Sequence, residues 1–127
     1  MLAFDRPDTW SLKYNLVWDR LWDSHLFSEE VYEKELAYYE KMKNPYGTPL
    51  DSRSTYTKSD WILWCASMAK DKEVTKRLLE PVADYLAQTE TRIPFSDWYY
   101  TDTGRYHSFI ARSVQGGIFM PILMQEK

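Results

Sequence analysis

The stretch SDWILWCASMAK, residues 59–70, decides the fold of this chain. Its apolar side chains fall on nearly every side of a helix, so the pattern predicts a central helix with neighbours on several faces. The lone cysteine, Cys65, lies in this run and has no second cysteine to pair with. We interpret it as a buried packing thiol rather than a catalytic nucleophile.

Two helices are predicted before this stretch, at residues 11–24 and 29–43. Ser28 is a suitable N-cap for the second, which Asn44-Pro45 then ends. The expected buried face of the first helix consists of Tyr14, Val17, Trp18, Leu21 and Trp22, and that of the second of Tyr32, Leu36 and Tyr39.

Two more helices are predicted after it. One begins behind Asp71 as its cap, and Pro81 predicts a kink or a restart within it. The other covers residues 109–123, where Gly116-Gly117 favours close packing against another element. The apolar stripe of the first consists of Val74, Leu78, Val82, Tyr85 and Leu86.

A small β-hairpin is predicted at residues 98–106, with its turn at 101–104 and Gly104 at positive φ. The fold class is therefore all-α, built from stacked helical hairpins, with this hairpin as an addition. Residues 1–127 form a single segment without an internal linker or sequence repeat.

Composition excludes some classes of partner. The net charge is −3 and 28% of residues are charged, without a long basic run, which argues against nucleic acid. No apolar stretch approaches the ~20 residues of a membrane span, and the chain does not open on a signal peptide.

Two polar loops concentrate the groups that could carry chemistry. The first, residues 49–61, brings Asp51, Arg53, Tyr56, Lys58 and Asp60 in front of the central helix, whose positive end suits an anion. Ordinary turns offer an alternative explanation: Asp51 and Ser52 would form a turn, Arg53 would tie the loop, and Thr57 or Ser59 would cap the helix.

The second loop covers residues 93–100 and continues through 105–113. It sets Asp97 beside Trp98, whose ring can raise a carboxyl pKa into the range for general acid or base work, and it also supplies Arg112. An Asx-turn beside a packed ring is an equal alternative. The two histidines lack ligand spacing and no nucleotide or hydrolase motif occurs, so we expect no metal or cofactor.

Several strings in order closely resemble the C-terminal part of the glutaminase A family, from about residue 2 to 123. They are KYNLVWD (13–19), YEKE (32–35), GTPLDSRSTYTKSDW (47–61), PFSDWY (94–99) and ARSVQGG (111–117). The resemblance implies a segment of a six-hairpin α/α toroid, with Met1 as an added start. It implies a secreted or cell-envelope parent that hydrolyses glutamine to glutamate and ammonia, with the remaining hairpins as partners.

Amide hydrolysis needs proton transfer, an oxyanion stabiliser and a grip on the substrate. We predict that Asp97 or Asp51 transfers protons, with Asp60 as the third carboxylate, and that Arg53 or Arg112 positions the substrate. Lys58 would add charge, and Tyr56 and Trp98 would wall the pocket. We expect the chain alone to be inactive.

Two alternatives stay open. Helical toroids also use paired carboxylates on glycosidic bonds, and clefts rich in aromatic residues stack on sugars, so a carbohydrate-active domain is one. A non-catalytic helical scaffold is the other. A partial toroid exposes an apolar edge, so we expect self-association.

Overall fold

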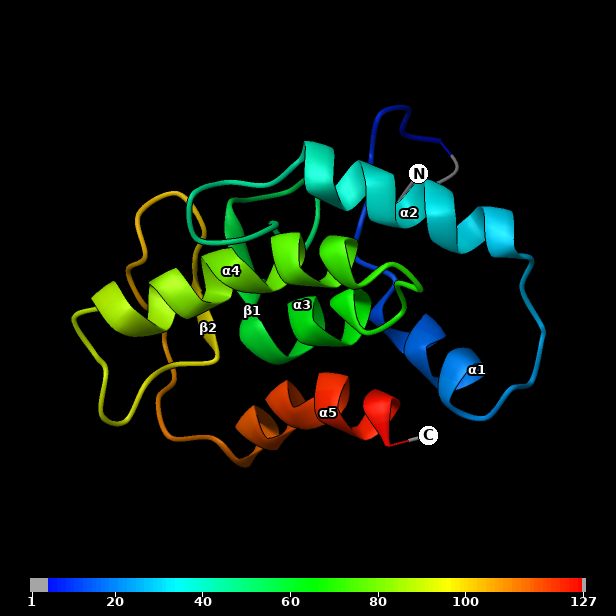
Figure 1. Ribbon diagram of the computed structural model, residues 1–127. Helices are drawn as coiled ribbons and strands as arrows, with labels where there is room; N and C mark the ends of the chain where they lie inside the picture. The colour runs from blue at the N-terminus through cyan, green and yellow to red at the C-terminus, as the bar shows by residue number, and fades with distance from the viewer. Residues whose placement is uncertain (1–4, 127) are drawn as a thin grey trace.

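The computed structural model describes residues 5–126. Five α-helices, two 3-10 helices and two short strands make up this part of the chain, with α3 in the middle and α2, α4 and α5 around it (Figure 1). In chain order they are η1 (Tyr14–Leu16), α1 (Val17–Leu21), α2 (Glu29–Lys41), β1 (Tyr56–Lys58), α3 (Ser59–Ala66), α4 (Lys72–Gln88), β2 (Trp98–Tyr100), η2 (Ser113–Phe119) and α5 (Met120–Gln125).

The central position of α3 is confirmed. Its side chains Ile62, Leu63, Cys65 and Ala66 are all buried, because α4, η1, η2 and α5 each pack against it. The predicted cap by Thr57 or Ser59 is wrong, since Lys58 is the N-cap and no side chain caps the helix. The backbone N–H of Ser59 instead donates to the carbonyl of Asp97 at 2.9 Å, which ties the helix start to the second loop.

Helix α2 buries its predicted stripe, whereas α4 buries Leu78, Val82 and Tyr85 and leaves Val74 and Leu86 half-buried. Asp71 caps α4 by accepting from the backbone N–H of Glu73 at 2.9 Å. A restart at Pro81 is wrong, because α4 continues through it. Proline has no N–H for the carbonyl of Arg77, four residues earlier. The ammonium of Lys43 donates to that carbonyl at 3.0 Å and so replaces the missing bond.

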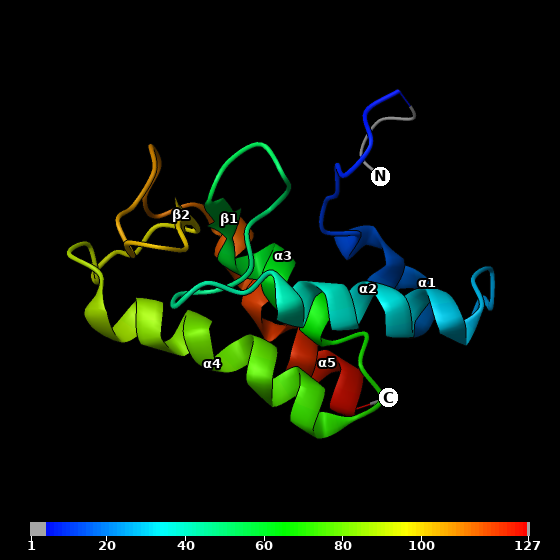
Figure 2. The ribbon, with the colours of Figure 1, turned by 90° about the horizontal axis from the view of Figure 1, so that it is seen from above.

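The two strands form a small antiparallel sheet, which makes the all-α class too narrow. Tyr56 pairs with Tyr100 and Lys58 with Trp98, so the two polar loops are joined at the N-terminal end of α3 (Figure 2). The hairpin turn at 101–104 is confirmed: Gly104 has φ +69° and a bridge joins Tyr99 to Tyr106. The regular partner of β2 is nonetheless β1, within the stretch predicted as loop.

The first and last predicted helices are shorter than expected. Residues 11 and 12 are extended, because Leu12 N donates to Leu50 O at 2.8 Å, and positive φ at Asp23 and His25 follows the end of α1. Trp22, placed on the buried face by its spacing, is 69% exposed. The last helix begins only at residue 113, after a positive φ at Ala111, and its first part is a 3-10 helix.

Close packing of the glycine pair is confirmed at Gly117. A Cβ there would lie 2.9 Å from both Asp60 Cβ and Trp64 Nε1, whereas a Cβ on Gly116 would meet nothing within 4 Å. Trp64 Nε1 donates to the Gly117 carbonyl at 3.0 Å, which fixes η2 on α3. Within residues 5–126, no helix is long and apolar enough to cross a membrane.

Candidate functional site

Asp97 lies at the centre of a charged cluster where the two polar loops meet. It is fully buried, and Arg112 grips it in two-pronged fashion, with Nε 3.0 Å from Oδ1 and Nη2 2.5 Å from Oδ2. The ammonium of Lys58 donates to Oδ2 at 3.2 Å. The strand pairing explains this meeting, because it sets Lys58 opposite Trp98, the neighbour of Asp97.

The charge state of Asp97 follows from these contacts. Burial alone would raise the pKa of this carboxyl, but the hydrogen bonds and positive charges of Arg112 and Lys58 outweigh burial and lower it. Asp97 is therefore a stable anion, and the fixed geometry suits a residue that holds its neighbours in place.

Asp60 lies in the first turn of α3 and has the opposite character. It is only 4% exposed, and its Oδ1 has no hydrogen-bond partner among the described residues. Burial raises the pKa of Asp60 to about 6, and the negative charge of Asp97 adds to the effect. Two nearby carboxyls with pKa values pushed apart are the arrangement that acid–base catalysis uses.

Aromatic rings surround the ammonium of Lys58. Its Nζ lies 4.7 Å from the ring centroid of Trp98 and 5.6 Å from that of Trp61. Trp98 in turn stacks on His107 at 4.0 Å and meets Tyr56 edge-on at 5.6 Å. The ion pair of Lys58 and Asp97 thus lies beside aromatic rings, which strengthen its electrostatic interaction by keeping water away.

Asp51 and Arg53 form a separate pair. Arg53 donates to the buried Asp51 carboxylate from Nε at 2.9 Å and from Nη2 at 2.6 Å, and these bonds lower the pKa of Asp51 despite its burial. The Arg53 side chain is 65% exposed. This pair borders a cleft of about 510 Å³, which is also lined by residues 11–16, Leu50 and Trp61.

The cleft connects to the charged cluster through two rings. Tyr14 stacks on Trp61 with centroids 4.0 Å apart, and burial together with the charge of Asp60 raises the pKa of Tyr14. Lys13 lies on the same wall, with Nζ 2.9 Å from the Ser11 carbonyl. Lys13 and Tyr14 are not among the predicted site residues, although they open the first family-like string, KYNLVWD.

Six of the eight predicted site residues meet around Asp97, and two form the pair at the cleft. Their roles stay predictions. Among residues 5–126, no three His, Cys, Asp or Glu side chains are grouped as metal ligands. The six that meet are Tyr56, Lys58, Asp60, Asp97, Trp98 and Arg112.

The known proteins that this chain resembles are glutaminases. The family model of the glutaminase A six helical-hairpin domain matches residues 1–122. Glutaminase A of Aspergillus oryzae is 36% identical over 126 residues, which cover 97% of this chain and 18% of that protein. A probable glutaminase of Arthroderma benhamiae is 30% identical over 155 residues, covering 98% of this chain and again 18% of the relative. No solved structure matches significantly.

Proposed function

The chain belongs to the glutaminase A six helical-hairpin family, and on that premise we propose that it supplies the proton-transfer group of an amidohydrolase that converts L-glutamine to L-glutamate and ammonia. The observation that carries this proposal is the buried carboxyl of Asp60. Its Oδ1 has no partner among the described residues, and its pKa of about 6 suits both giving and taking a proton near neutral pH.

The reaction assigns two steps to Asp60. As a carboxylate it removes a proton from the water that attacks the amide carbon, and a C–O bond forms. As the resulting acid it passes that proton to the amide nitrogen, so the C–N bond breaks and ammonia leaves. Lys58 uses one N–H on Asp97, and its other donors are suited to the negative charge that develops on the oxygen.

Asp60 is a better candidate for proton transfer than Asp51 and Asp97, the two carboxylates predicted for this role from the sequence. Asp51 and Asp97 are each bound by an arginine and have lowered pKa values, so both are poor proton carriers at neutral pH. Asp97 acts better as a positioning residue, since it fixes Lys58 and Arg112 and its charge helps to raise the pKa of Asp60.

The activity of the whole protein is a wider proposal, because the chain spans 18% of the length of the curated relatives it matches. We propose that residues 1–127 are one segment of an α/α toroid, completed by further hairpins, in a secreted or cell-envelope protein. The exposed apolar side chains of η2 and α5 support a larger assembly.

A carbohydrate-active domain is the second candidate, and a row of aromatic rings favours it. Trp22 stacks on Trp18 at 5.3 Å, and Trp18 meets Trp64 edge-on at 5.2 Å. Because Trp22 is 69% exposed, one end of the row offers a flat surface on which a sugar ring could stack.

Release of ammonia from L-glutamine tests the proposal, with release of reducing sugar from glycans measured in parallel. Both are assayed on this chain and on the longest polypeptide that contains it. We expect ammonia from the longer protein, and a loss of roughly 100-fold or more in kcat for Asp60→Asn. Asp84→Asn removes an exposed carboxylate of α4 and serves as the control. Sugar release without ammonia release from either form would overturn the proposal.

A further inference from the structure

Backbone contacts fix the shape of the cleft beside Asp51 and Arg53. Leu12 N donates to Leu50 O at 2.8 Å and a bridge joins Ser11 to Asp51, so its two sides are tied by backbone contacts. The backbone N–H of Lys13 donates to the buried hydroxyl of Tyr39 at 2.8 Å. A volume of about 510 Å³ lies within the range of small-molecule sites.

We infer that this cleft holds the α-carboxylate of an amino acid, with Arg53 and Lys13 as its cationic groups. The choice of an amino acid, rather than another small carboxylate, rests on the proposed glutaminase activity. Arg53 is aligned by Asp51 through Nε and Nη2, which leaves Nη1 for a ligand. Its partner Asp51 is buried while the Arg53 side chain is 65% exposed, so the cation is the more accessible member of this pair in the cleft.

Lys13 adds a second positive charge to the lining of the cleft. Its ammonium is bound to the Ser11 carbonyl at 2.9 Å and the Ser11 hydroxyl at 3.3 Å, and Glu35 lies 3.7 Å away. These contacts hold the ammonium in place while more than a third of the side chain stays exposed. A fixed ammonium and an aligned guanidinium together suit a single carboxylate.

The stacked rings of Tyr14 and Trp61 would orient the ligand in the cleft. Tyr14 and Trp61 line the cleft as stacked rings, and Trp61 follows Asp60 in the chain. Asp60 thus directly precedes the ring that stacks on Tyr14, and its charge also raises the pKa of Tyr14. A ligand anchored at Arg53 would extend its methylene groups along these rings and bring its side-chain amide toward Asp60.

Binding to the 127-residue chain tests the inference without any need for turnover. The indole N–H signal of Trp61, assigned with Trp61→Phe, is followed by NMR while L-glutamine or 4-aminobutanamide is added. The second compound is glutamine without its α-carboxylate. We expect L-glutamine to shift the signal saturably and 4-aminobutanamide to bind roughly tenfold more weakly or worse.

Substitutions of the two cationic residues test where the α-carboxylate of the ligand binds. Lys13→Met and Arg53→Met should each weaken L-glutamine binding roughly tenfold, while Lys34→Met and Arg77→Met, which remove cations elsewhere, should not. If Arg53→Met disturbs the fold, Arg53→Lys keeps the charge without the two-pronged bond and should still weaken binding. Equal affinity for the two compounds, or no saturable shift with glutamine, would overturn the inference.

The inference and the proposed activity fail in different ways. If the longer protein releases ammonia with an unchanged KM in Lys13→Met and Arg53→Lys, the cleft does not hold the carboxylate and the glutaminase proposal stands. If glutamine binds here by its carboxylate and no ammonia appears in the longer protein, the activity is wrong and the binding site stands.

Discussion

Asp60 and Asp97 are nearby carboxyls whose pKa values move in opposite directions. Both are buried, and burial raises the pKa of each. Asp97 has Arg112 and Lys58 to reverse the effect, whereas Asp60 has the charge of Asp97 to add to it. The placement of two cations on the Asp97 carboxylate therefore keeps Asp97 ionised, whereas Asp60 holds its proton to a higher pH.

The raised pKa of Asp60 predicts a pH-dependent stability. The folded state holds the proton up to about pH 6, against 3.8 for the ordinary carboxyl, so folding binds a proton in this window. The free energy of unfolding should fall as pH rises through it and stay level above. Asp60→Asn should remove this fall, so its stability relative to the parent chain should improve by about 1–3 kcal/mol from pH ~4 to pH ~7. Urea unfolding at both pH values measures the difference, and a constant gap would contradict it.

Asp97→Asn should lower the free energy of unfolding strongly at neutral pH. It leaves Lys58 and Arg112, whose side chains are 13% and 33% exposed, without their buried anion, and breaking a buried pair costs about 3–5 kcal/mol. Asp51→Asn is the matched control, because its partner Arg53 can turn to solvent and the loss should stay at about 1 kcal/mol or less. Equal losses in urea unfolding would show that the two pairs are equivalent.

Helices whose burial follows a local apolar period were predicted correctly from the sequence. The strand that depends on pairing with a distant segment was missed. The stripe of α2 and the apolar surround of α3 follow from spacing alone. Strand β1 consists of three residues whose partner lies some 40 positions later, so no local pattern marks it. The same holds for the candidate site. The residue types of the two loops were recognisable in the sequence, but only the pairing of β1 with β2 shows that the loops lie together.

The contact between η2 and α3 predicts opposite results for two adjacent glycines. Gly117→Ala would drive a methyl group into Asp60 and Trp64, and such overpacking costs about 1–3 kcal/mol. Gly116→Ala meets open space and restricts the unfolded chain, so it should be neutral or stabilise by up to about 1 kcal/mol. Thermal unfolding of the two variants checks the contrast. Equal melting temperatures would mean that η2 does not seat on α3 as described.

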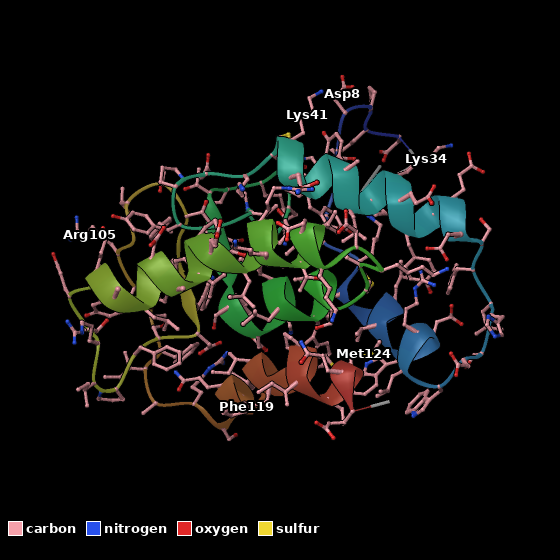
Figure 3. The ribbon with its side chains drawn as sticks, viewed as in Figure 1. Asp8, Lys34, Lys41, Arg105, Phe119 and Met124 are labelled. Atoms are coloured by element: carbon pink, nitrogen blue, oxygen red, sulfur yellow. The ribbon has the colours of Figure 1, made fainter. Side chains whose placement is uncertain are left out.

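For the whole molecule, the C-terminal surface predicts self-association. Residues 113–125 contain no charged side chain, and four apolar side chains there are exposed. Figure 3 shows Phe119 on the lower side of η2 and α5, away from the lysines of α2. Exposed apolar side chains gathered on one surface favour association with a second copy, for which a symmetric dimer is the commonest arrangement. The four side chains are Val114, Phe119, Ile122 and Leu123.

Sedimentation of the chain over a range of concentrations checks this prediction. We expect the mass to rise with concentration, and Phe119→Asp combined with Ile122→Lys to return it to that of the monomer, because each change places a charge in the buried contact. Lys34→Glu changes a charge on the exposed face of α2 and should leave association intact. A chain that stays monomeric at about 100 μM would show that this surface does not bind a second copy on its own.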